Sequence, residues 1–230
     1  PDQVRLRSYQ PVLKGHQGQI KRAANMLVSS ERPIIYAGGG VIIDNASEYL
    51  TLLARKLNAP VTNTLMGLGA FPGTDPQFLG MLGMHGTYEA NSAMHHADVV
   101  FAVGARFDDR VTNEIDKFCP KEKIIHIDID PTSVSKNVAA DIPIVGKCSI
   151  VLKSMLDYIK SEDLVVDDAR LSRWWSQINE WRDLHGIYSK SRYEPSKLSL
   201  IKPQDVIKAV YEVTKGDAIV TSDVGQHQMF

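Results

Sequence analysis

The sequence has few cysteines, no long apolar run and almost no excess of charge of either sign. Its only cysteines, Cys119 and Cys148, stand far apart outside any CxxC spacing, which argues against a disulfide framework or a zinc site. A formal net charge of −1 and the lack of a dense basic run give no support for nucleic acid as a partner. The apolar runs are far shorter than a membrane span. We therefore expect a cytoplasmic protein that binds neither nucleic acid nor membrane.

Both ends of the chain look cut from a longer one, because it begins at Pro1 in a polar arm and stops soon after a strand predicted at residues 217–224. Changes in composition predict four parts. Residues 1–18 form an incoming arm, residues 19–165 a central domain and residues 166–200 a helix with a linker at 189–199. Residues 201–230 are expected to begin a further domain.

The most informative stretch is residues 98–112. Val99–Val103 is a continuous apolar run, typical of a strand that is buried on both faces, and the chain turns polar after Gly104. Arg106 and Arg110 flank two aspartates, so this loop can hold an anionic ligand. The alternative is a surface loop with local ion pairs.

The preceding part of the chain resembles the start of a nucleotide-binding sheet. A helix over residues 19–29 and a strand over residues 34–37 lead into Gly38-Gly39-Gly40, where a diphosphate can approach the main chain. We expect Asp44 or Asn45 to cap the next helix, which carries apolar residues from Leu50 to Leu57. The glycine pattern lacks a third glycine at Ile43, and is weak evidence alone.

Further strands are predicted at residues 59–64, 123–130 and 141–146, with helices at 87–96 and 150–159. The glycine-rich, apolar stretch at residues 65–73 suits the lining of a flat ring, and residues 79–84 have the same character. Asp128 is expected at the carboxyl end of a strand, where it can bind ribose hydroxyls; a metal site with His126 and Asp130 is the alternative. Pro143 indicates an edge strand. The pattern predicts a doubly wound, six-stranded parallel α/β sheet.

After residue 166, Asp167 and Asp168 begin a helix with an aromatic stripe, Trp174, Trp175 and Trp181. Because no basic groove accompanies the stripe, we interpret it as packing rather than base stacking. A helix from Lys202 to Val213 and a strand over residues 217–224 are predicted to follow.

Taken together, five ordered stretches resemble the large subunits of the acetohydroxyacid (acetolactate) synthase family, in their bacterial form. They are residues 64–73, 82–90, 104–112, 126–131 and 224–229. The resemblance covers essentially the whole chain and implies the Rossmann-like central domain of a thiamine diphosphate enzyme.

That family joins pyruvate, after loss of CO2, to a second 2-oxo acid in branched-chain amino-acid synthesis, as a homodimer with a regulatory small subunit. Its cofactors are thiamine diphosphate, Mg2+ and an FAD with no net redox role. Carried over position by position, the resemblance implies FAD contacts at Gly38, Gly39, Gly40, Thr64, Leu65, Met66, Leu82, Gly83, Met84, His85, Gly104, Ala105, Arg106, Asp108, Arg110, Val111, Asp128, Ile129, Asp141 and Ile142.

The resemblance also implies a substrate channel at Met84, Asp109 and Arg110, and thiamine diphosphate contacts at Val224, Gly225, Gln226 and His227. It supplies no catalytic residue and no metal ligand within these 230 residues, so we expect them to be inactive alone. Two other functions remain open: the central domain of another thiamine enzyme, which binds a nucleotide or coenzyme A, and a redox flavoprotein.

Overall fold

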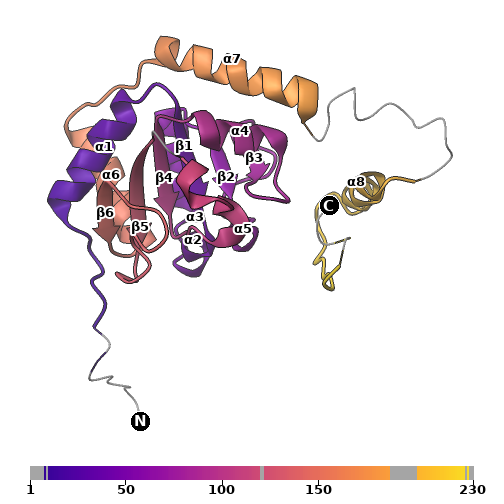
Figure 1. The fold of residues 1–230 in the computed structure, drawn as a ribbon, viewed down its shortest axis with the longest axis horizontal. Helices are drawn as coiled ribbons and strands as arrows, with labels where there is room; N and C mark the ends of the chain where they lie inside the picture. The colour runs from indigo at the N-terminus through magenta and orange to yellow at the C-terminus, as the bar shows by residue number, and fades with distance from the viewer. Residues whose placement is uncertain (1–7, 9, 120–121, 187–200, 226, 228–230) are drawn as a thin grey trace. The chain divides into compact units, whose positions relative to one another are not determined.

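The computed structural model describes residues 8, 10–119, 122–186, 201–225 and 227 (Figure 1). The chain divides into two compact units, residues 1–189 and 190–230, which are treated separately below.

The first unit is built on a six-stranded sheet in which every neighbouring pair of strands is parallel. The strand order is β3-β2-β1-β4-β5-β6, so the chain moves outward from β1 to β3 and then returns to the other side of β1. This doubly wound topology confirms the predicted fold class. The strands are β1 (Pro33–Ala37), β2 (Val61–Asn63), β3 (Phe78–Met81), β4 (Val99–Val103), β5 (Lys123–Asp128) and β6 (Ile142–Val145).

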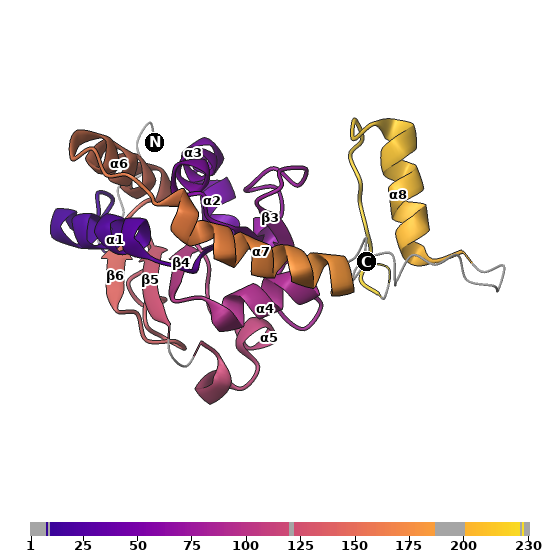
Figure 2. The same cartoon turned by 90° about the horizontal axis from the view of Figure 1, so that it is seen from above.

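Helices cover both faces of the sheet; Figure 2 shows α3 and α6 on one side and α4 on the other. The α-helices of this layer are α1 (Gln17–Ser29), α2 (Gly39–Ile43), α3 (Ser47–Leu57), α4 (Tyr88–His96), α5 (Asp109–Thr112) and α6 (Cys148–Ser161), and the 3₁₀ turns are η1 (Leu65–Gly67) and η2 (Ile115–Lys117). The four long helices confirm the sequence-based predictions. The short α2, formed by the glycine run, was not predicted.

The core lies on both sides of the sheet because alternate strand residues face opposite layers. On β1, Ile35 packs with α1, α3 and α6, while Ile34 and Tyr36 pack with α4. All five residues of β4 are buried, which confirms that Val99–Val103 is a strand covered on both faces.

Two local predictions need correction. Residues 78–81, part of a stretch interpreted as loop-like, form the edge strand β3, whose Gly80 takes a positive φ of 88°. Neither Asp44 nor Asn45 caps α3; Ala46 occupies that position, without a side-chain hydrogen bond. Asp44 instead accepts hydrogen bonds from the main-chain N and Oγ of Ser149, at 2.8 and 2.7 Å, in the first turn of α6. Pro143 does lie in an edge strand, β6, as predicted.

Helix α7 (Asp168–His185) crosses the edge of the sheet at which the strands begin (Figure 1). Its side chains donate hydrogen bonds to main-chain oxygens just before or at the start of three strands: Trp174 to Pro33, Trp175 to Asn58, and Arg182 to both Pro76 and Phe78. The side chains of Leu171 and Ile178, on the same helix, are buried. The aromatic stripe is therefore used for packing, as predicted.

In the second unit, helix α8 (Pro203–Thr214) confirms the predicted helix. The predicted strand over residues 217–224 is not formed: those residues have no strand conformation, because no described segment pairs with their main chain. The predicted linker at residues 189–199 lies outside the described residues. None of the described helices is long and apolar enough to cross a membrane.

Candidate functional site

The six strands end along one edge of the sheet, and the segments that leave them are joined by five main-chain hydrogen bonds. In each, the first residue after one strand donates to the end of the neighbouring strand, at 2.9–3.1 Å: Leu82 to Asn63, Thr64 to Ala37, Gly38 to Val103, Gly104 to Ile127 and Gly146 to Asp128. These bonds hold most of the predicted site residues side by side at the carboxyl edge, where open α/β sheets bind ligands.

The centre of this edge lies at the ends of the neighbouring strands β1 and β4. Here the strand order switches: β2 and β3 follow on one side of β1, and β4, β5 and β6 on the other. The turn at Gly38–Gly40 packs directly on the turn after β4. A Cβ on Gly38 would lie 2.2 Å from the oxygen of Gly104, and one on Gly40 would lie 2.8 Å from the Gly104 Cα. Gly104 itself has a φ of 56°. The glycines are thus needed for the contact of these two turns, and Gly39, Gly40 and Gly104 remain partly exposed at the edge.

Exposed apolar side chains border the glycine turns. Leu65 and Met66 in η1 are 49% and 76% exposed, and Met84, after β3, is 54% exposed. The main chain of η1 is nevertheless fixed, because Asn63 Nδ2 donates to the oxygen of Gly67 at 2.8 Å. A rigid loop that presents apolar side chains to solvent is suited to cover a flat, apolar ligand.

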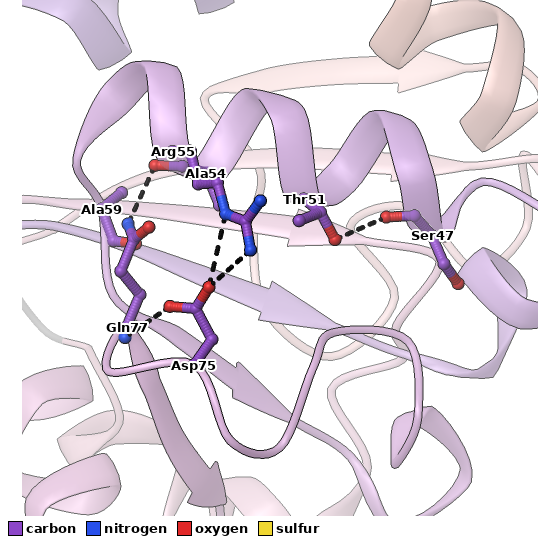
Figure 3. A network of polar contacts seen from close by, with 7 residues as sticks. All are labelled: Ser47, Thr51, Ala54, Arg55, Ala59, Asp75 and Gln77. Carbon is purple, nitrogen blue, oxygen red and sulfur yellow. Dashed lines mark hydrogen bonds and ion pairs between the residues drawn. The ribbon is translucent and has the colours of Figure 1, made fainter.

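The far end of the same loop is tied to α3 (Figure 3). Asp75, whose side chain is 9% exposed, pairs with Arg55 at 2.9 Å and accepts a hydrogen bond from the main chain of Gln77. Gln77 Nε2 donates to the oxygens of Ala54 and Ala59 at 3.0 and 2.7 Å. The loop from η1 to β3 is therefore fixed at both ends.

The segment after β3 lies against α5. The main-chain N of Met84 donates to the oxygen of Arg110 at 3.3 Å, and a Cβ on Gly83 would lie 2.8 Å from that oxygen. Asn91 of α4 bonds both main-chain groups of Gly83. The structure thus brings together Met84, Asp109 and Arg110, the three residues predicted to line a substrate channel. His85 is exposed beside them.

The loop after β4 presents two arginines. Arg106 Nη2 pairs with Asp108 at 3.1 Å, and both side chains are largely exposed. The exposed Arg110 side chain has no hydrogen bond or ion pair to any described residue; the bonds of Arg110 are made by its main chain, to Asp109 and Met84. Both guanidinium groups therefore retain N–H donors for an anion.

Phe107 anchors this loop in the core. Its ring lies 5.6 Å from Tyr36 and 5.3 Å from His126, between centroids. His126 Nε2 lies 2.9 Å from the carbonyl oxygen of Ala105, and since a carbonyl only accepts, this nitrogen carries the proton. Burial lowers the pKa of His126, although the hydrogen bond to Ala105 and the charge of Asp128 oppose the shift. Burial, helped by Asp108, raises the pKa of the Tyr36 hydroxyl. Both groups are neutral near pH 7 and support the loop from below.

The other end of the edge carries carboxylates and residues that the sequence analysis missed. Asp128 is half-buried at the end of β5 and accepts a hydrogen bond from the main chain of Asp130, while Ile129 is exposed. Lys147 pairs with Asp44 at 3.0 Å. Burial opposes ionisation of Asp44, but the hydrogen bonds from Ser149 and the charge of Lys147 lower its pKa overall. The missed signal was the position of Gly146 and Lys147 at and directly after the end of the strand predicted at residues 141–146.

Cys148 takes no part in a reactive site. Its thiol lies beneath Gly104, 3.0 Å from where a Cβ on that glycine would be. Burial, with the charges of Asp44 and Asp128, raises the pKa of the thiol to about 12. It is therefore a protonated packing residue at neutral pH.

Asp141 and Ile142 do not join this group. They lie at the opposite edge, where β6 begins, and Ile142 is fully buried. Asp141 accepts hydrogen bonds from Lys123 Nζ at 2.8 Å and from the main chain of Ile124 at 3.0 Å. Although burial opposes it, these contacts lower the pKa of Asp141. The sequence contains the reason for the separation, since Asp141 precedes the apolar run of the strand and Ile142 is its first residue.

Of the residues assigned to thiamine diphosphate, Gln226 lies outside the described residues. Val224, Gly225 and His227 belong to the second unit, and Val224 is 88% exposed. No group of three His, Cys, Asp or Glu side chains suited to a metal ion occurs in the described part of the chain.

The carboxyl edge is an open surface rather than a closed pocket. A cavity of about 220 Å³ reaches it at Leu82 and at Val111 and Thr112 of α5. A larger one, of about 590 Å³, lies at the opposite edge, beside α7.

Comparison with known proteins gives matches along the whole chain. Residues 20–155 match the family model described as "Thiamine pyrophosphate enzyme, central domain". The whole chain is 54% identical to an acetolactate synthase large subunit from Buchnera aphidicola (subsp. Schizaphis graminum) and 53% identical to the isozyme 3 large subunit from Escherichia coli K12. It is 45% identical to a probable acetolactate synthase large subunit from Methanocaldococcus jannaschii. The chain spans only about two fifths of these relatives, 38–39% of their length.

Proposed function

Since the chain belongs to the thiamine pyrophosphate enzyme family, of which it contains the central domain, we propose that its protein is an acetolactate synthase and that this domain binds FAD. The activity is the decarboxylation of pyruvate and the joining of the remaining two carbons to a second 2-oxo acid. Identity of 53–54% along the whole chain to large subunits of that name supports the assignment. Assembly as a homodimer with a regulatory small subunit, in the cytoplasm, is part of the same proposal.

In this proposal the FAD diphosphate lies over the turns at Gly38–Gly40 and Gly104, in which Gly39, Gly40 and Gly104 are partly exposed. Arg106 and Arg110 donate to its phosphate or ribityl oxygens, and Asp128 accepts from the adenosine ribose. The exposed side chains of Leu65, Met66 and Met84 border the flavin ring. The remaining carboxyl-edge residues assigned from the sequence are retained here: Thr64, Leu82, Gly83, His85, Ala105, Asp108, Val111 and Ile129.

The residues present fit FAD in two ways. The ligand combines a flat ring with a dianionic bridge, and the edge combines an exposed apolar border with two arginines that have N–H donors to spare. Asp141 and Ile142 are left out of the proposed site because they lie at the other edge. Gly146 and Lys147, which follow β6 at the carboxyl edge, replace them as candidates for the adenosine end.

The proposed channel residues act on the 2-oxo acid by position and charge. Arg110, with no other partner among the described residues, pairs with the substrate carboxylate, and Met84 excludes water from its apolar side. Asp109 holds the main chain of Arg110, through a bond of 2.9 Å. Thiamine diphosphate, with Mg2+, supplies the electron sink for decarboxylation when it is bound. We propose that Val224, Gly225, Gln226 and His227 contact that cofactor.

The observation that carries the FAD proposal is the exposed Arg110 beside the glycine turns. We expect the purified chain, soaked with FAD and freed of unbound ligand, to keep flavin absorption bands in a near-stoichiometric amount. Arg110→Ala should weaken FAD binding by about tenfold or more, the value of one charge-assisted hydrogen bond. Arg22→Ala is the matched control, because Arg22 lies on α1 and bonds only Gln19 among the described residues.

A colourless wild-type chain, or FAD retention that Arg110→Ala leaves unchanged, would contradict the proposed site. If such a chain bound coenzyme A in place of FAD, the alternative of another nucleotide-binding central domain would hold.

A further inference from the structure

The largest cavity described above lies far from the proposed FAD site, at the edge where the strands begin. Its volume is about 590 Å³, and its walls include Arg32, His96, Arg170, Arg173, Trp174 and Trp181. Arg32 directly precedes β1 and His96 ends α4, while the other four residues come from α7. We call it the amino-edge pocket. The function proposed above leaves it unused.

Helix α7 supplies nearly half of the lining residues. Arg170, Trp174, Gln177 and Trp181 follow one another at intervals of three and four residues, which places them in a row along the helix. Trp174 is buried at the base of this row and is held there by its hydrogen bond to Pro33. The row therefore has a fixed position on the sheet.

Three arginines line the pocket, and the guanidinium group of each has N–H donors left over. Arg170 uses Nη2 on the oxygen of Val28, at 2.5 Å, while its Nε is buried without a partner in the described structure. Arg32 uses Nε on the oxygen of His96, at 2.7 Å. Arg173 has no hydrogen bond or ion pair to any described residue. Arg32 and Arg170 thus have fixed orientations, because each bonds a main-chain oxygen. Guanidinium groups in fixed orientations are suited to bind an anion.

Two glutamates, Glu31 and Glu122, also line the pocket, so its arginines outnumber its glutamates by one. The aromatic part of the wall is organised as well. Trp181 is half-buried and stands edge-on to Trp174, with ring centroids 5.7 Å apart, and His96 lies 5.2 Å from Trp181. A planar ring can pack against the remaining surface of Trp181.

We propose that the amino-edge pocket binds a small phosphate ester that carries a planar ring. A phosphate dianion matches several guanidinium forks better than a carboxylate does, because it offers more acceptor oxygens and more charge. The ring occupies the side of the pocket formed by Trp181 and His96. The volume lies within the range of ordinary small-ligand pockets, about 300–1,000 Å³.

The three tryptophans of the chain all lie on α7, and this gives a local test. We would record the indole N–H signals of the 15N-labelled chain by NMR during titration with phenyl phosphate, with and without FAD. The signals of Trp174 and Trp181, assigned with Phe variants, should shift in a saturable manner, and that of Trp175 should shift less because it is bonded to Asn58. Inorganic phosphate and phenol should each bind at least tenfold more weakly.

Arg173→Gln should weaken phenyl phosphate binding by about tenfold, whereas Arg22→Gln, a matched exposed arginine on α1, should leave it unchanged. Absence of a saturable shift, shifts of equal size with phenol, or binding unaffected by Arg173→Gln would each overturn the proposal. Retention of FAD is measured separately by absorbance, so failure of one site is distinguishable from failure of the other.

Discussion

The two edges of the sheet are held by different means. At the carboxyl edge, five main-chain hydrogen bonds and the contact of Gly38 with Gly104 fix the loops, and the charged side chains remain exposed. At the amino edge, tryptophan and arginine side chains of α7 bond to main-chain oxygens. An edge whose loops are fixed by main chain leaves its side chains available to a ligand, whereas the amino edge uses many of its side chains for stability.

The largest effect should follow from adding one methyl group at the carboxyl edge. Gly38→Ala places a Cβ 2.2 Å from the oxygen of Gly104 and 2.5 Å from the Cα of Ala105, and neither main-chain atom can move without breaking the hydrogen-bond series. We expect a loss of about 3 kcal/mol in the free energy of unfolding, measured with urea. Gly73→Ala is the control, because its Cβ meets nothing closer than 4.0 Å. Equal stability of the two variants would show that the turns are not in close contact.

At the amino edge the largest effect should come from Trp174→Phe. The change removes a buried N–H donor and leaves the oxygen of Pro33 without that partner. We expect a loss of about 2 kcal/mol in the free energy of unfolding. Because α7 does not reach the carboxyl edge, FAD retention at low urea should be unchanged. A parallel loss of FAD would mean that the two edges are coupled.

A pair of arginines compares the edges directly. Arg182 donates to two main-chain oxygens from a partly buried position, so Arg182→Ala should lower the free energy of unfolding by about 1 kcal/mol. Arg106 makes one exposed ion pair, so Arg106→Ala should change it by less than about 0.5 kcal/mol. For FAD binding the order should reverse, with Arg106→Ala the more harmful. If both variants were equally destabilised, the contrast between the edges would fail.

The smallest expected effect on stability comes from His126, which lies beneath the loop after β4. Its pKa is lowered in the folded chain by burial, so the unfolded chain takes up a proton near pH 6.5 while the folded chain does not. The contribution of His126 to stability should therefore be constant above that pH and fall as the pH decreases through it. The difference in unfolding free energy between pH 7.5 and pH 5 should be smaller for His126→Gln. An identical pH dependence in both proteins would contradict this assignment.

The sequence was sufficient for those parts of the fold that depend on local pattern. The buried run Val99–Val103 and the apolar stripe of α6 both formed the predicted elements, because burial on one or two faces leaves a periodic signature. Edge strand β3 was missed, since Gly80 and partial exposure conceal its pattern. The predicted strand at residues 217–224 did not form, because a strand also needs a partner, which its own sequence does not specify.

The site was predictable to the extent that it follows strand ends. Gly38, Gly104 and Arg110 were identified because each follows an apolar run, and the topology brings them together. Asp44 was assigned to the nearest helix in the sequence, yet it binds Ser149, 105 positions away. The amino-edge pocket was not foreseen, because residues far apart in the sequence, such as Arg32 and Arg173, meet only after α7 has packed across the sheet.

The bond between Asp44 and Ser149 bears on how the chain is made. During synthesis at about 5–20 residues per second, the 105 positions between the two residues take roughly 5–20 seconds to appear. Throughout that interval the glycine turn after β1 exists without α6. During this time the first half of the domain has an incomplete sheet. Its apolar strands are then most exposed to binding by a chaperone or by another nascent chain.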